Sequence, residues 1–279
     1  MTMKTYVKLT NGFGNNIFQY VAAKLLHKRL NSEELIVIPY SKNYYAIDSL
    51  KELGISCDYK LPKKNFIHVG DGNYDKAQMY NGNDDLLLEG YFEDYRYYYP
   101  NLDLIKSWFP EVKPRKDNDL VVHFRTGDRL FMRNEFFTKP GPKQYLQAIR
   151  QFNFDRLHIV TDMPKWGHVS SSELRSMKFH NNVPDSERVD INLSVDYFNS
   201  FVDMFSEFSP VIEKGSILED FNKIRSFRNI LFEHGTLGWW ASVLSGADKV
   251  GVYGPWRQWK GDKNKNLSNI PMRGWFKWE

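Results

Sequence analysis

Three segments place glycine beside polar or charged residues where an apolar run ends, a combination that can bind an anion. One runs from Gly12 to Gly14, one from His123 to Asp128 and one from His234 to Gly238. Backbone N–H groups at the start of a helix attract phosphate oxygens, and an arginine offers a planar fork that matches them. We therefore expect a ligand that contains phosphate.

Each segment also has a purely structural interpretation. The first is no dinucleotide fingerprint, because Ile17 stands where the third glycine belongs, and a tight turn would explain it alone. Arg125 and Asp128 could pair with each other across a turn, and Thr236 could simply cap a helix. We favour binding at Arg125, where a strand end, a glycine and ionisable groups coincide. For Thr236 taken alone both interpretations stay open, and binding is favoured when Thr236 is considered together with Arg125.

Several other chemistries find no support in the sequence. There is no G-x-S-x-G elbow, no Walker A loop and no H-E-x-x-H, and the seven histidines lack metal-ligand spacing. The D-x-D segment Asp117-Asn118-Asp119 lies in a stretch rich in proline and charge, so we interpret it as a solvated loop. No metal or other cofactor is expected.

The elements around these segments alternate between strand and helix. The order strand, helix, strand within residues 6–38 starts again at residues 120–124, after a charged, proline-rich linker at residues 110–119. Further strands are expected at 157–160, 230–232 and 250–253, whereas residues 60–85 are expected to form a surface excursion. The pattern predicts an α/β protein with two Rossmann-like domains facing a cleft, the first at residues 1–113 and the second at 114–279.

Composition limits the class of protein. With 42% hydrophobic and 26% charged residues the chain has ordinary globular values, and its single cysteine allows no intrachain disulfide. No apolar stretch is long enough for a membrane span and no signal region opens the chain, so we expect a soluble cytoplasmic or otherwise intracellular protein. The formal net charge of +4 resides in residues 256–279. Residues 1–255 therefore have no net charge, which argues against duplex nucleic acid as a partner.

Five segments resemble, in the same order, sequence blocks of the α-1,2-fucosyltransferase family and its wider superfamily. They are Asn11–Tyr20 (G-x-G-N-Q-x-F-Q-Y), Leu88–Asp94 (G-Y-F-Q-S), His123–Asp128 (H-x-R-R-G-D), Val160–Trp166 (S-D-D-x-x-W) and Thr236–Ala241 (S-T-F-S-W-W-A). The departures fall mainly in the donor blocks: Thr126 replaces the second arginine, Asn16 a glutamine, His234-Gly235 an Asn-Ser pair and Leu237 a phenylalanine.

The resemblance implies a metal-independent, inverting glycosyltransferase of the GT-B arrangement. Arg125 would hold the leaving diphosphate. Asp128 and Glu135, on the loop after Arg125, are the candidates to accept the proton of the acceptor hydroxyl, and either could instead be structural. The resemblance also implies that the first domain binds mainly the acceptor, with Tyr91 as one of the residues on that side. The donor-binding residues implied or expected are Gly12, Gly14, Asn15, His123, Arg125, Thr161, Asp162, Asp220, Gly235, Thr236 and Leu237.

Asp220 bears on the choice of nucleotide. It precedes Gly235 about where superfamily members place an acidic residue against the base, and a carboxylate accepts the paired N–H donors of guanine. Glu219 is the neighbouring alternative, and a carboxylate favoured by a helix N-terminus is the structural one.

The tail at residues 256–279 holds four of the eight tryptophans. We expect it to return toward the first domain, where Trp256 and Trp259 could form an acceptor platform while Trp275 and Trp278 dock the chain end.

The function expected is transfer of fucose from GDP-fucose to a glycan hydroxyl. The alternatives are a relative that uses another donor, such as a UDP-pentose or UDP-hexose, and a non-catalytic glycan-binding protein. The expected partners are therefore a sugar nucleotide and a glycan acceptor.

Overall fold

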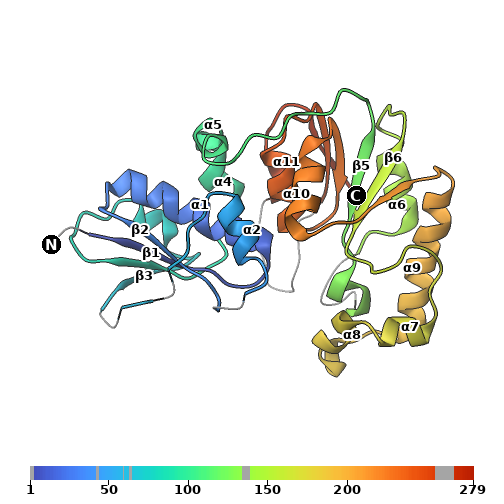
Figure 1. The fold of residues 1–279 in the computed structure, drawn as a ribbon, viewed down its shortest axis with the longest axis horizontal. Coiled ribbons are helices and arrows are strands. Elements are labelled where there is room, and N and C mark those ends of the chain that lie inside the picture. Colours follow the sequence, from blue (N-terminus) through green and yellow to red (C-terminus); the bar gives the residue numbers. More distant parts are fainter. Residues whose placement is uncertain (1–2, 42–43, 59, 63–64, 134–138, 255–266) are drawn as a thin grey trace. The chain divides into compact units, whose positions relative to one another are not determined.

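The chain forms two compact units, Met1–Glu111 and Val112–Glu279. The computed structural model describes residues 3–41, 44–58, 60–62, 65–133, 139–254 and 267–279, coloured in Figure 1. The division between the units lies close to the domain boundary predicted after residue 113. Each unit contains one parallel sheet covered by helices, so the α/β class with two Rossmann-like units is confirmed.

The first unit is built on a four-stranded parallel sheet in the order β2-β1-β4-β3. Its long helix α1 is buried along most of its length and ends where Asn31 adopts a left-handed conformation, with basic residues in the last turn that suit the helix dipole. The elements of this unit are β1 (Thr5–Lys8), α1 (Phe13–Leu30), β2 (Leu35–Ile38), α2 (Ile47–Glu52), β3 (Ile67–Val69), α3 (Tyr74–Ala77), β4 (Leu86–Leu88), α4 (Tyr95–Tyr98), the 3-10 turn η1 (Tyr99–Asn101) and α5 (Leu102–Lys106).

The second unit has a six-stranded, fully parallel sheet in the order β10-β9-β8-β5-β6-β7, which is the 3-2-1-4-5-6 order of a Rossmann fold. In Figure 1, α10 and α11 cover one face and α6 and α9 the other. The elements are β5 (Leu120–Phe124), η2 (Gly127–Phe131), α6 (Pro142–Ile149), β6 (Leu157–Thr161), α7 (Ser171–Arg175), α8 (Lys178–Asn182), η3 (Asp185–Glu187), α9 (Ile191–Ser206), β7 (Val211–Glu213), α10 (Ile217–Ser226), β8 (Asn229–Phe232), α11 (Thr236–Val243), β9 (Lys249–Tyr253), η4 (Leu267–Asn269) and β10 (Trp275–Trp278).

An aromatic core fixes β5 within this unit. Phe124, at the end of β5, packs against Phe201 and Phe205 of α9 with ring centroids 4.7 and 5.6 Å apart. Tyr145 of α6 lies against Phe201 and Trp278 at 5.1 and 4.8 Å. Aromatic pairs at such separations contribute beyond the area they bury. The strand that carries the His123–Asp128 segment therefore ends on a rigid support.

Two expectations about the path of the chain are wrong. Residues 60–85 are no mere excursion, because β3 within them pairs with β4. The end of the tail belongs to the second unit, because β10 pairs with β9 and the ring of Trp278 packs against that of Tyr253 at 4.8 Å. Trp278 is buried within its own unit, where β10 forms the edge of the sheet, and this removes the reason for the chain end to dock elsewhere.

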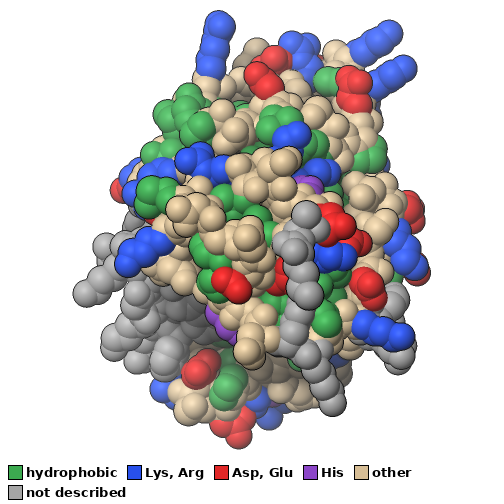
Figure 2. All heavy atoms as spheres, turned by 90° about the vertical axis from the view of Figure 1, so that its left-hand side faces the viewer, with side chains coloured by type: hydrophobic (Ala, Val, Ile, Leu, Met, Phe, Trp, Pro, Cys, Tyr) green, Lys and Arg blue, Asp and Glu red, His purple; other side chains and the backbone are tan. Residues whose placement is uncertain are grey.

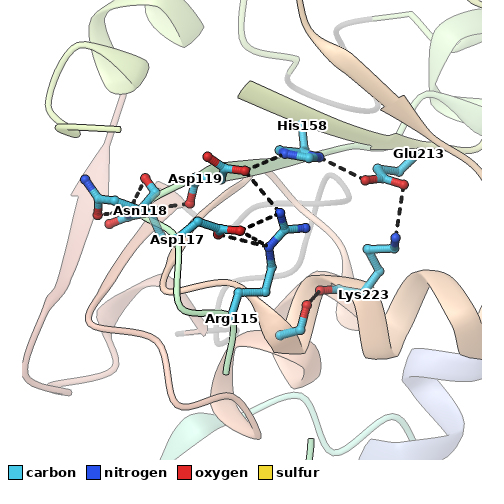
Figure 3. A network of polar contacts seen from close by, with 9 residues as sticks. Arg115, Asp117, Asn118, Asp119, His158, Glu213 and Lys223 are labelled. Carbon is cyan, nitrogen blue, oxygen red and sulfur yellow. Dashed lines mark hydrogen bonds and ion pairs between the residues drawn. The ribbon is translucent and has the colours of Figure 1, made fainter. Parts of the chain in front are cut away.

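The D-x-D segment is part of a charged network rather than a solvated loop (Figure 3). The two ring nitrogens of His158 each lie 2.9 Å from a carboxylate, one from Asp119 and the other from Glu213. Arg115 contacts Asp119 at 3.1 Å, and Lys223 contacts Glu213 at 3.1 Å. The side chains of His158 and Asp119 are only 6% exposed, so their contact lies inside the unit.

Charges on the surface are mixed in sign. Figure 2 shows one face, on which lysine and arginine side chains lie among acidic and apolar ones instead of gathering in one patch. In the first unit, Lys4 pairs with Glu34 at 2.8 Å and Lys8 with Glu89 at 3.1 Å. Among the residues that the structure describes, no helix is both long and apolar enough to cross a bilayer.

His158→Leu tests the charged network. The substitution removes one hydrogen-bond partner from each of the carboxylates of Asp119 and Glu213, which keep Arg115 and Lys223, and such a loss in a buried network costs about 1–3 kcal/mol of unfolding free energy. We expect a loss of that size in urea denaturation, and partial recovery when Asp119→Asn is added. Lys51→Ala is the control, because its pair with Asp48 is exposed and should contribute less than about 1 kcal/mol. A loss under 1 kcal/mol for His158→Leu would contradict this account.

Candidate functional site

The candidate site lies at the carboxyl ends of β5 and β8, neighbouring strands in the middle of the second sheet. The register pairs His123 with Phe232, so the segments that follow both strands begin at the same level. From β5 the strand order continues outward to one edge and from β8 to the other, which makes this the topological switch point. Open α/β sheets bind their ligands at such points. Two of the three segments singled out from the sequence thus meet at one junction.

Close packing brings His123, Arg125 and the start of α11 together. A Cβ placed on Gly235 would lie 3.5 Å from Cε1 of His123 and 3.8 Å from Cδ of Arg125. A Cβ on Gly238 would lie 2.7 Å from Nδ1 of His123, closer than real side chains approach. The two glycines therefore let His123 of β5 and Arg125, which follows this strand, approach the first turn of the helix.

His123 is a buried side chain with spare hydrogen-bonding capacity. It is 7% exposed, and its Nδ1 contacts no hydrogen-bond partner among the described residues. Burial lowers the pKa of His123 to about 3, helped by the positive charges of Arg125 and Arg129. The ring is therefore neutral at physiological pH, and its Nδ1 is enclosed against Gly238 of α11.

The loop after β5 is held by Asp162, which follows β6. One carboxylate oxygen, Oδ1, accepts hydrogen bonds from N and Oγ1 of Thr126 at 2.9 and 2.8 Å and from N of Gly127 at 3.1 Å. Gly127 has φ +42°, a left-handed conformation that suits glycine. Thr126, which stands where the family has a second arginine, thus anchors the loop. Asp162 shapes the site through this loop. Oγ1 of Thr161 accepts a hydrogen bond from N of Met163 at 3.2 Å, in the turn that follows β6.

Two ionisable residues of the junction were not anticipated from the sequence. Arg129 in η2 is 6% exposed and donates from Nη1 to the carbonyl of His234. Burial lowers the pKa of Arg129 to about 10, and burial raises the pKa of Glu233, the residue after β8, to about 7 against the opposing charge of Arg129. The sequence signal for Arg129 was its spacing of four residues from Arg125, and the signal for Glu233 was its place directly after an apolar run.

The remaining residues expected on the donor side fall in three places. Thr236 is 5% exposed and begins α11, followed by the half-buried Leu237. Asp128 is half-buried in η2, beside the loop. Gly12, Gly14 and Asn15 lie at the start of α1 in the first unit. The structure describes neither Glu135 nor Trp256 and Trp259, so these predictions lie outside the described residues.

Asp220 has a different set of neighbours from Arg125. It lies in the first turns of α10, where burial raises its pKa to about 6, opposed by the backbone of Gly215 and by Lys223. Glu219 and Glu213 raise it further. None of the contacts found for the described residues joins Asp220 to Arg125 or Gly235, so its part in the same site stays a prediction.

In the first unit, the two remaining family-like segments are tied together by hydrogen bonds. Nε2 of Gln19 in α1 donates to Oγ1 of Thr10 at 2.8 Å and to the carbonyl of Gly90 at 2.9 Å. Asn16 donates to the carbonyl of Thr10 at 2.9 Å, and Asn11 donates to the hydroxyl of Tyr91. The buried polar residues of these segments thus join the ends of β1 and β4. Tyr91, expected on the acceptor side, is 37% exposed there.

Comparisons with known proteins give a remote structural likeness. No family model matches the chain, and no curated protein matches it. Among solved structures it is similar to the bacterial iron-containing dodecameric glycosyltransferase TibC from enterotoxigenic E. coli H10407, with a TM-score of 0.41 and 10% identity. The match covers 94% of this chain but only 63% of that one. A likeness this remote does not carry the activity of that protein over to this chain.

Asp162→Ala tests the support of the loop. Three donors lose their acceptor, and leaving such groups unpaired costs about 1–3 kcal/mol each where they stay buried. We expect clear destabilisation in urea, together with faster hydrogen exchange at the amides of Thr126 and Gly127. Asp162→Asn keeps one carbonyl oxygen in place and should retain most of the protection. Unchanged exchange at both amides in the alanine variant would show that Asp162 does not hold the loop.

Proposed function

We propose that the junction of β5 and β8 binds the diphosphate of a sugar nucleotide, and that the protein is a glycosyltransferase. One observation carries the proposal: Arg125 and the buried, neutral His123 approach the start of α11 at the switch point of the sheet. An arginine beside the N-terminus of a helix suits an anion. A diphosphate matches this set of donors.

The chemistry follows from stabilising a leaving group. When the glycosidic bond to a nucleoside diphosphate breaks, negative charge grows on the phosphate oxygens, and donors already in position stabilise it. Arg125 is held at the end of a rigid strand and needs no nucleophile from the protein beside it. The acceptor hydroxyl must lose a proton, for which Asp128, on the same loop, and Glu135 are the candidates. The reaction would invert the anomeric centre and use no metal.

Fucose is the sugar that the sequence resemblance favours, with GDP-fucose as donor and a glycan hydroxyl as acceptor. Five family-like segments in order support this choice. Thr126, which binds Asp162 instead of offering a second guanidinium, keeps a UDP-pentose or UDP-hexose donor open as the alternative. A non-catalytic glycan-binding role would show nucleotide binding without turnover. On the acceptor side Tyr91, Trp256 and Trp259 remain the proposed residues.

A screen of sugar nucleotides with Arg125→Ala tests the donor site. A ligand that binds only the folded protein raises its apparent stability, so we expect one donor to raise the melting temperature of the wild-type protein and to be slowly hydrolysed. Arg125→Ala should lose both effects, with about 10²–10³-fold less turnover, which is typical when one such donor is removed.

Arg125→Lys should restore little, because a point charge does not replace a bidentate fork. Arg150→Ala, an exposed arginine at the end of α6, is the matched control and should behave like wild type. Turnover by Arg125→Ala close to the wild-type rate would contradict the assignment.

Asp220 provides a test of the choice of base. As a carboxylate it can accept two N–H donors of guanine, whereas the amide of Asp220→Asn accepts one and repels the other. We expect Asp220→Asn to weaken the binding of GDP more than the binding of UDP in calorimetry, with Glu207→Gln, an exposed carboxylate at the end of α9, as the control. Because the pKa of Asp220 is raised to about 6, the carboxyl is protonated below pH 6, and the preference for GDP should fall between pH 7 and 5. Equal binding of GDP and UDP by the wild type would refute this role.

A further inference from the structure

Glu233 is a buried carboxyl group for which the proposed reaction has no use. It is the first residue after β8, directly before His234, whose carbonyl accepts from Arg129. Only 4% of its surface is exposed. No hydrogen bond from a described residue to its carboxylate is found, so burial and the charges nearby act on its ionisation.

The charges around Glu233 come from every element of the junction. Arg129, Arg125 and Lys139 favour its ionised form, while Asp162 disfavours it. Three buried or half-buried tyrosines also lie within its electrostatic reach. The groups that interact electrostatically with it are Arg125 after β5, Arg129 in η2, Lys139 before α6, Asp162 after β6, Tyr145 in α6, Tyr197 in α9 and Tyr253 in β9. Three further residues of the junction act on these partners: Asp128 on Arg129, His123 on Arg125 and Arg129, and His234 on Tyr253 through a ring contact.

Ionised Glu233 offsets part of the positive charge of Arg125, Arg129 and Lys139 when no anion is bound. Arg129 and Lys139 are themselves buried cations whose pKa values are lowered to about 10 and 8, mainly by burial, so a nearby negative charge stabilises them. Glu233 supplies that charge when the junction holds no ligand. A bound anion supplies it instead, and then two negative groups share one set of cations.

We propose that Glu233 is a positioning residue that takes up a proton from solvent when an anionic group binds at the junction of β5 and β8, and releases it when the anion leaves. The inference rests on the anion site of the proposed function. The ionised carboxylate keeps Arg129 against the carbonyl of His234 in the empty protein, and the neutral acid avoids repelling the bound phosphate.

Linkage fixes the sign of the effect. Burial raises the pKa of Glu233 to about 7, and an anion nearby raises it again, so the bound state holds more protons than the free state near neutral pH. Anion affinity must then fall as pH rises above 7, by at most about tenfold per pH unit for a single proton. Removing the carboxyl group removes this dependence.

Carbon-13 NMR of the protein labelled only in its glutamate side-chain carboxyls tests the inference. Sulfate is the probe, because it stays doubly charged between pH 5 and 9, and chloride at equal ionic strength is the control. The signal missing from Glu233→Gln identifies the group. Should that variant fail to fold, Glu233→Asp also removes the labelled signal while keeping the charge. We expect a midpoint near pH 7 in chloride and a higher one in sulfate.

Two further samples localise the effect. Arg125→Ala should abolish the upward shift in sulfate, and Glu173→Gln, an exposed carboxylate of α7, should leave it intact. A midpoint below pH 5 in chloride, or no difference between sulfate and chloride, overturns the inference. An upward shift in sulfate without binding of any sugar nucleotide supports the proton-linked anion site and refutes the proposed function instead.

Discussion

The parallel pairing of β5 with β8 is the constraint on which the candidate site depends. These two strands lie in the middle of the sheet, where the order of strands reverses, and their register sets His123 level with Phe232. Because both connections leave the same edge, the loop after β5 and the first turn of α11 must share one space. Gly235 and Gly238 provide that space by carrying no side chain against His123.

The charges at this junction follow from burial. A sheet edge closed by helices disfavours ions, so His123 stays neutral, and Arg129 and Lys139 hold their protons less firmly than in water. Glu233, buried among these cations, is held close to its titration midpoint at neutral pH. Such an arrangement responds strongly to any added negative charge. That response is what connects the proposed binding of a diphosphate with the proposed proton uptake.

Apolar strands and the motifs at their ends could be predicted from the sequence, whereas long-range partners could not. β5, β6, β8 and β9 are continuous apolar runs and were expected. Edge strands such as β3 and β10 include polar or charged residues, which conceal their pairing, and the helical spacing of apolar residues in α9 was overlooked. Asp162 reaches a loop 36 residues away and Arg129 a carbonyl 105 residues away. A local sequence pattern cannot reveal contacts between residues so far apart in the sequence, so these two contacts are visible only in the folded chain.

Backbone amide NMR of the labelled protein, titrated with GDP-fucose and separately with UDP-glucose, tests the central claim most directly. If the diphosphate binds where β5 and β8 end, the largest chemical-shift changes will occur at residues 125–128 and 235–238 and will saturate with one ligand per chain. Changes centred on residues 12–15 at the start of α1, with the junction unaffected, would contradict the account.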